Sequence, residues 1–128
     1  MRSAAALKAP VNSADSGAWA EGVALRHLEH RGLALITRNY RCRLGELDLI
    51  MEHGQMLVFV EVRLRNNRTY GDGLESVTYA KQRKLARAAG VFLMRNPRYR
   101  KRRCRFDVVS VSKQNDRANC EWIRNAFA

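Results

Sequence analysis

The sequence has few cysteines, few acidic residues and no long hydrophobic run. Its three cysteines, Cys42, Cys104 and Cys120, are scattered without CxxC spacing. This pattern excludes a disulfide framework and a common zinc site, and it favours reduced thiols. No apolar stretch approaches the length that crosses a bilayer, and the short one near the N-terminus does not make a secretion signal. These absences predict a cytoplasmic protein without a membrane segment.

The shortage of acidic residues leaves a large excess of positive charge. The chain has 24 Lys and Arg against 12 Asp and Glu, a net charge of +12 and a pI near 10.6. Such a balance favours a polyanionic partner, most often nucleic acid and less often an anionic membrane surface. Two alternatives are a basic protein that charge keeps soluble and an interaction protein for the ribosome or the membrane.

The length and the order of patterns predict one α/β domain. A chain of 128 residues with 46% hydrophobic residues can bury one core. Residues 1–16, rich in Ala and Ser, predict a flexible N-terminal tail, and residues 17–128 a single domain. Helices are expected at residues 17–30 and 76–94, and strands at 33–37, 46–51, 56–64, 106–111 and 120–127. The order α-β-β-β-α-β-β predicts a mixed β-sheet flanked by α-helices, with the third and fourth strands parallel.

Acidic residues interrupt a predicted hairpin, "GELDLIMEHGQMLVFVEVRLR" (residues 45–65). If its turn has two residues, His53 pairs with Met56, and counting back places Asp48 opposite Glu61. Directly opposed residues have Cβ atoms about 4.5–5.5 Å apart, so the two carboxylates would repel each other. A divalent cation would remove the repulsion, and oxygen ligands suit Mg²⁺ or Mn²⁺. We therefore expect a metal site here.

The alternative to a metal site is a set of ordinary sheet salt bridges. Glu46 and Glu61 would then pair with neighbouring arginines, which are Arg43, Arg63 and Arg65. For either interpretation, strict alternation along the first strand of the hairpin predicts Leu47, Leu49 and Met51 on one face and Glu46, Asp48 and Ile50 on the other.

A third carboxylate lies on the first predicted helix. Glu21 falls on an apolar stripe with Ala24, Leu25 and Leu28, where an unpaired carboxylate is costly. If it points at the hairpin, Glu21 is a third ligand or holds a water on the metal. If it lies at the edge of the stripe, it reaches solvent instead.

Taken in order, these segments resemble a known family. "AEGVALRHLEHRG", "RNYR", "GELDLI", "VFVEVRLR", "YAKQRKLARAA" and "RFDVVSV" resemble the YraN-like family of predicted nucleases over residues 17–112. That family is similar to archaeal Holliday-junction resolvases and belongs to the restriction-endonuclease-like PD-(D/E)xK superfamily. The resemblance implies cleavage of DNA that depends on a divalent metal, Mg²⁺ or Mn²⁺, and it allows a homodimer because resolvase relatives act as dimers.

The resemblance also implies roles for single residues. Asp48 matches the metal-binding Asp, Glu61 the acidic residue of the (D/E)xK element, and Glu21 the acidic residue on the first helix of the resolvase-like branch. Glu46 is present in the family pattern, where it would support Asp48. All four positions would then belong to one site.

One residue departs from the motif. The motif has Lys two residues after Glu61, and this chain has Arg63. Arginine grips phosphate oxygens but cannot act as a base. Lys81 or Lys84, on the second predicted helix, could reach into the sheet in its place; the simpler expectation is that both extend to solvent. Arg63 therefore leaves an alternative function open, a nucleic-acid-binding protein with a nuclease fold and little or no activity.

Nucleic acid is expected to contact two basic connectors. "RNPRYRKRRCR" (residues 95–105) enters a strand of the same domain and could contact phosphates alongside the site, and residues 38–43 precede the hairpin. Such contacts do not read bases, and no helix-turn-helix or zinc finger is visible, so recognition of a branch or junction by shape is expected. The predicted contacts are Arg38, Arg41, Arg43, Arg65, Lys81, Lys84, Arg98, Arg100, Lys101, Arg102 and Arg103.

Overall fold

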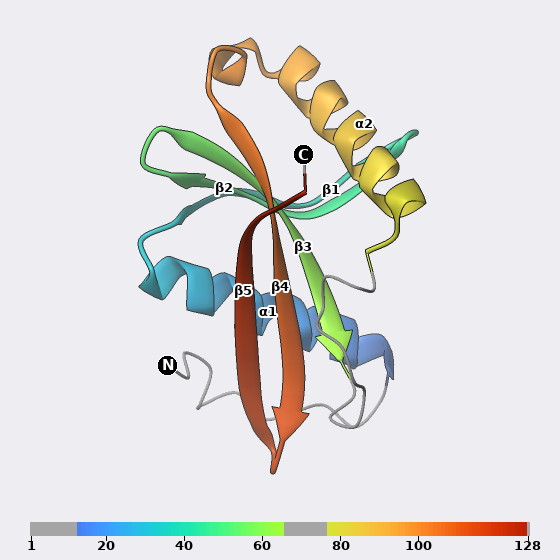
Figure 1. Cartoon of the computed structure of the whole chain (residues 1–128), viewed down its shortest axis with the longest axis vertical. Coiled ribbons are helices and arrows are strands. Elements are labelled where there is room, and N and C mark those ends of the chain that lie inside the picture. Colours follow the sequence, from blue (N-terminus) through green and yellow to red (C-terminus); the bar gives the residue numbers. More distant parts are fainter. Residues whose placement is uncertain (1–12, 66–76, 128) are drawn as a thin grey trace.

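The computed structural model describes residues 13–65 and 77–127, which form two α-helices, five strands and one short 3₁₀ helix (Figure 1). The elements are α1 (Ser13–His30), β1 (Ala34–Cys42), β2 (Gly45–His53), β3 (Met56–Arg65), α2 (Tyr79–Arg95), η2 (Pro97–Tyr99), β4 (Cys104–Gln114) and β5 (Arg117–Phe127). The predicted element order is therefore confirmed. Within these ranges no helix has the length and apolar character needed to cross a bilayer.

The five strands form one mixed sheet in the order β1-β2-β3-β4-β5. Neighbouring strands are antiparallel except β3 and β4, which are parallel, as predicted. The connection between these two contains α2, because a parallel pair needs a crossover. In the hairpin of β2 and β3, His53 pairs with Met56, so the predicted register is also confirmed.

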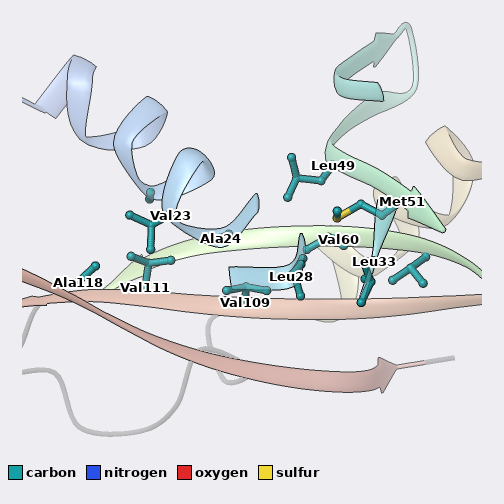
Figure 2. Close-up of a cluster of buried hydrophobic side chains, with 12 residues drawn as sticks. Val23, Ala24, Leu28, Leu33, Leu49, Met51, Val60, Val109, Val111 and Ala118 are labelled. Atoms are coloured by element: carbon teal, nitrogen blue, oxygen red, sulfur yellow. The ribbon is translucent and has the colours of Figure 1, made fainter. Parts of the chain in front are cut away.

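Each helix covers one face of the sheet with its own core. α1 packs its apolar side against one face of the central strands (Figure 2). α2 packs against the other face through Leu85, Ala88, Ala89 and Phe92. In β3, Val58 and Val60 belong to the α1 side, and Leu57 and Phe59 belong to the α2 side. This alternation directs the next residue, Glu61, toward α2.

The alternation expected along β2 breaks at Asp48. Leu49 belongs to the core under α1 but Leu47 to the core under α2, so the prediction that the two share a face was wrong. The backbone pairing of β2 with β3 ends at Leu49 and Val60. On the other side of β2, Asn39 of β1 has a positive φ of 55° at the same level. Asp48 thus lies where β2 leaves regular pairing with β3.

Several element boundaries differ from the sequence prediction. α1 begins at Ser13, so residues 13–16 are helical and not the end of a tail. Residues 1–12 of the predicted tail lie outside the described ranges, as does the polar segment at residues 66–73, between the third predicted strand and the second predicted helix. β1 extends to Cys42, so most of the predicted connector at residues 38–43 is a strand paired with β2. Local composition suggested a basic loop there, whereas pairing with a neighbouring strand decides the structure.

Candidate functional site

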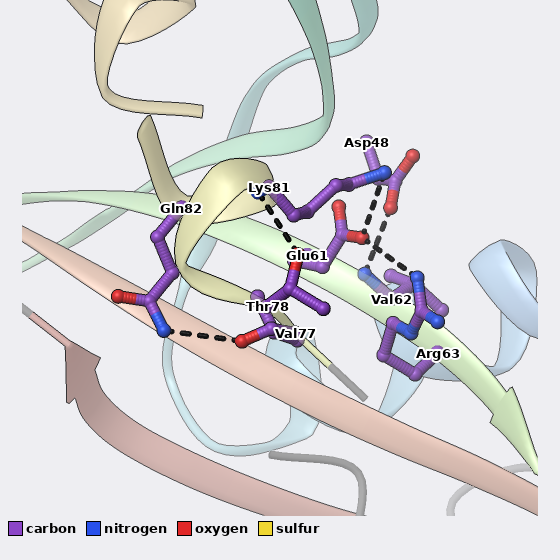
Figure 3. A network of polar contacts seen from close by, with 8 residues as sticks. All are labelled: Asp48, Glu61, Val62, Arg63, Val77, Thr78, Lys81 and Gln82. Carbon is purple, nitrogen blue, oxygen red and sulfur yellow. Dashed lines mark hydrogen bonds and ion pairs between the residues drawn. The ribbon is translucent and has the colours of Figure 1, made fainter. Parts of the chain in front are cut away.

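The carboxylate of Asp48 is fixed beside β3 by a backbone hydrogen bond. Val62 N donates to Asp48 Oδ2 at 2.8 Å. The backbone pairing of β2 and β3 ends at Leu49 and Val60, just before this bond. The Asp48 side chain therefore provides Val62 N with the acceptor that the backbone of β2 no longer supplies. Because Val62 is the neighbour of Glu61, the bond holds the Asp48 carboxylate next to that of Glu61 (Figure 3).

Glu61 is buried and contacted by two cations from different elements. Its residue exposure is 4%, Arg63 Nη1 lies 3.3 Å from its Oε2, and Lys81 Nζ lies 3.4 Å from the same oxygen. Arg63 comes from β3 itself and Lys81 from α2. The side chain of Lys81 remains 43% exposed. For Lys81 the expectation that it extends only to solvent was wrong, because its ammonium group reaches the sheet.

Two local features bring Lys81 to this position. Thr78 caps α2, since its Oγ1 accepts a hydrogen bond from Lys81 N at 3.1 Å, which fixes the first turn of the helix. Gly45, at the start of β2, lets the helix approach: a Cβ there would lie 2.9 Å from Lys84 O. Only glycine permits this packing of backbone against backbone. This role of Gly45 could not be predicted, because a single glycine before a strand carries no sequence signal for a close approach.

The carboxylates of Asp48 and Glu61 repel each other. Burial, the charge of Glu61 and, more weakly, the charge of Glu21 raise the pKa of Asp48 to about 7, and the hydrogen bond from Val62 acts in the opposite direction. The repulsion that the sequence predicted is therefore present. Near neutral pH the Asp48 carboxyl group exchanges a proton, which marks it as a candidate for chemistry or for cation binding.

The pair opens into a small pocket whose donors suit a divalent cation. The pocket has a volume of about 170 Å³ and is lined by Gly45, Glu46, Asp48, Glu61, Lys81, Lys84 and Leu85. The contacts above use one oxygen of each carboxylate, Asp48 Oδ2 and Glu61 Oε2, and the two side chains are close enough to share a hydrogen bond with each other. Two carboxylate oxygens on a partly open pocket fit Mg²⁺ or Mn²⁺, which keep several waters as ligands.

The other two predicted acidic residues lie at the edge of this site. Glu21 is 3.9 Å from Arg38, and burial raises the pKa of Glu21 while Arg38 and Asn39 lower it. Glu46 lines the pocket and pairs with Arg41 at 3.4 Å. In the described ranges no three His, Cys, Asp or Glu side chains are placed to share one metal ion. The roles of Glu21 as a third ligand and of Glu46 as a support stay predictions.

A second buried carboxylate shows what a purely structural acid looks like here. Asp107 of β4 is fully buried, accepts hydrogen bonds from Arg105 Nε and Trp122 Nε1, each at 2.9 Å, and accepts another from Asn125 N. Every oxygen of Asp107 is thus used to hold β5 against β4. Asp48 has one donor and a carboxylate neighbour instead, which distinguishes it from an ordinary buried acid.

The structure separates the predicted nucleic-acid contacts into two groups. Lys81 and Lys84 line the pocket, whereas the basic run at residues 95–105 lies at the opposite end of α2, about 21 Å away by helical rise. The prediction that the basic run lies alongside the carboxylates was therefore wrong. Four predicted arginines form ion pairs within the chain: Arg38 with Glu21, Arg41 with Glu46, Arg65 with Glu121, and Arg102 with Glu52.

Comparison with known proteins gives one consistent family. A UPF0102 protein of Stutzerimonas stutzeri is 50% identical over 115 residues, which are 90% of this chain and 96% of that protein. A UPF0102 protein of Nitrosococcus oceani is 46% identical over 118 residues, covering 92% and 95% of the two chains. The model of the uncharacterised protein family UPF0102 matches residues 20–111. The resemblance to YraN-like proteins is confirmed, and the chain belongs to family UPF0102.

Proposed function

We propose that the protein is a divalent-metal-dependent phosphodiesterase that cleaves DNA. The observation that carries this proposal is the pairing of a half-buried Asp48 with a buried Glu61 in one pocket, where burial and, next, the charge of Glu61 raise the pKa of Asp48 to about 7. Such a pair is stabilised by a cation, and oxygen donors select Mg²⁺ or Mn²⁺. The net charge of +12 supports a polyanionic substrate.

Each side chain has a part that follows from its position. Asp48 and Glu61 would hold the ion, which when bound lowers the pKa of a water and neutralises charge at the scissile phosphate. Lys81 and Arg63 both contact Glu61 Oε2, so they orient this carboxylate. Lys81 lines the pocket and Arg63 lies beside the same carboxylate, so both would attract phosphate oxygens. Arg63 supplies charge but cannot remove a proton.

Incubation with branched and linear DNA, with and without Mg²⁺ or Mn²⁺, tests the proposal. We expect metal-dependent cleavage by the parent, faster on the branched DNA, and no cleavage by Asp48→Ala. DNA affinity of that variant should stay within about threefold, because phosphate contacts carry most of it. Cleavage that persists in Asp48→Ala would reject this site, and equal binding and cleavage of both DNA forms would reject recognition by shape.

A second candidate function is a nucleic-acid-binding protein that retains the nuclease fold but does not cut. The observation that favours it is Arg63 at the position where the motif has Lys. This function predicts salt-dependent DNA binding without cleavage in either metal. A gain of cleavage on Arg63→Lys would identify the chain as an impaired enzyme rather than a binding module.

A further inference from the structure

Residues 76–106 contain no Asp or Glu but eleven Lys and Arg. They comprise α2, η2 and the start of β4, which follow one another in space as well as in the chain (Figure 1). Arg83, Lys84, Arg87 and Arg95 of α2 are all exposed. Beyond the helix, Arg98, Arg100, Lys101 and Arg103 are exposed too. We call these eight residues the α2 basic track.

The α2 basic track differs from the other basic residues in its partners. Arginines of β1 and β3, such as Arg38, Arg41 and Arg65, form ion pairs with carboxylates of the same chain. In the described part of the chain, none of the eight track residues forms an ion pair with a carboxylate; Arg83 and Arg98 instead lie over the rings of Tyr79 and Tyr99. Their positive charge is therefore directed outward and remains available to an anion.

Repulsion among the cations of the α2 basic track lowers the stability of the helix, and a bound anion would offset this loss. Arg83 and Arg87 are four residues apart on α2, and like charges at this spacing destabilise a helix. No acidic residue in the first turn of α2 relieves the repulsion. A surface that is unfavourable for folding and regular in charge is typical of a binding surface, where stability is lost in exchange for function.

The track joins two concave regions at opposite ends of α2. At the N-terminal end is the pocket with Asp48 and Glu61, where Lys84 is shared by the track and the pocket lining. At the other end is a larger hollow of about 470 Å³, lined by Gln55, Met56, Arg98, Lys101, Arg102 and Arg103. The distance along the helix is about 21 Å, which is about six base pairs at 3.4 Å each.

We infer that one arm of a DNA duplex lies along the α2 basic track, from the carboxylate pocket to the hollow near η2. About six to eight base pairs on one side of the scissile phosphate would be held by this surface. The inference rests on the proposed function for the identity of the ligand, but it does not depend on cleavage. It also predicts how the duplex arm is oriented: the end of the arm farthest from the scissile phosphate contacts Lys101 and Arg103, which line the hollow near η2.

The test compares two double variants that remove equal charge from two separate places, the far end of the track and the C-terminal end of α1. Lys101→Gln with Arg103→Gln removes exposed cations at the far end of the track. Arg26→Gln with Arg31→Gln removes one exposed cation near the C-terminal end of α1 and one directly after the helix. Affinity for a linear duplex of about 16 base pairs, twice the proposed contact length, is measured by fluorescence anisotropy over a range of salt.

We expect the track variant to bind at least about tenfold more weakly than the parent, and the slope of log affinity against log salt to fall by about 1.8, since each lost phosphate contact contributes about 0.9. The α1 variant should bind within about threefold of the parent, with an unchanged slope. Equal losses in both variants, or no loss in either, would overturn the track while leaving DNA binding intact. Failure of the parent itself to bind duplex DNA would instead reject the nucleic-acid partner of the proposed function.

Discussion

Lys81 Nζ of α2 lies 3.4 Å from Glu61 Oε2 of β3, so an ammonium group reaches this buried carboxylate from a helix and not from its own strand. In the PD-(D/E)xK pattern that the chain resembles, the ammonium group comes from the strand, where this chain has Arg63. The contact supports our proposal that Lys81 supplies the ammonium charge beside Glu61 that the motif lysine would otherwise supply. It also gives a specific expectation for its removal.

Lys81→Gln should separate cleavage from metal binding. We expect metal-dependent cleavage to fall by about 10²-fold, the usual effect of losing one charge-stabilising group at a reacting centre. Mn²⁺ should bind somewhat more tightly than in the parent, because a positive charge beside Glu61 is gone. Lys113→Gln, on an exposed residue near the end of β4, is the control and should change neither quantity. A loss of cleavage no larger than in this control would remove Lys81 from the site.

Glu61→Gln should lower the pKa of Asp48 without restoring its ordinary value. Burial is the largest cause of the raised pKa and the charge of Glu61 the second, so the substitution removes only the second. We expect the pKa of Asp48 to fall from about 7 to a value still above 3.8. An NMR titration of the Asp48 side-chain carbon measures this directly. An unchanged pKa would mean that the two carboxylates do not interact.

Asp48→Asn should stabilise the metal-free protein at alkaline pH. The pKa of Asp48 is raised from 3.8 to about 7 on folding. The folded protein therefore favours the protonated form of Asp48. The stability that this preference contributes is complete below pH 3.8, is lost as the pH rises toward 7, and is absent above pH 7. The shift sets an upper limit of about 4 kcal/mol, and solvent at the pocket screens part of it, so we expect a gain of about 2 kcal/mol at pH 8.

The gain from Asp48→Asn should shrink at pH 5, because the parent then keeps its proton. Urea unfolding at both pH values measures the difference. Asp107→Asn is the contrasting variant: it breaks the buried pair with Arg105 and should destabilise the fold by about 3 kcal/mol or more. If Asp48→Asn destabilises the protein as Asp107→Asn does, Asp48 is a structural acid.

Gly45→Ala should displace α2 from the pocket. The new Cβ would meet the Lys84 carbonyl oxygen at 2.9 Å, and a backbone atom cannot move without the helix. We expect a loss of about 1–3 kcal/mol in the free energy of unfolding, and a fall in cleavage as Lys81 moves away from Glu61. Gly90→Ala on the exposed side of the same helix, where a Cβ meets nothing, should instead stabilise by about 0.5–1 kcal/mol. Equal effects of the two substitutions would contradict the close approach at Gly45.

The hairpin shows why part of the site could be predicted from sequence. The turn after His53 and the alternation of Val58, Phe59 and Val60 are local signals, and they fixed the register and the face of Glu61 correctly. The break at Asp48 could not be predicted in this way. It depends on where β2 and β3 stop pairing and on the positive φ of Asn39 in a neighbouring strand.

The direction of Lys81 and the partners of the arginines depend on tertiary structure. Lys81 and Lys84 share one side of α2 in sequence, and docking of the helix at Gly45 determines what they reach. Arg65 pairs with Glu121, which lies on a strand far along the chain, so no local pattern separates this arginine from the unpaired ones of the α2 basic track. Charge composition predicts a polyanionic partner, but it cannot predict which surface would bind that partner.

The most direct test of the account is calorimetric titration of the protein with Mn²⁺ at pH 8 and pH 6, for the parent and for Asp48→Asn. We predict one bound ion in the parent at pH 8, binding about tenfold weaker at pH 6 because Asp48 must first lose its proton, and no measurable binding by Asp48→Asn. The same affinity in parent and variant, or an affinity in the parent that does not change with pH, would contradict the claim that Asp48 and Glu61 form a cation site.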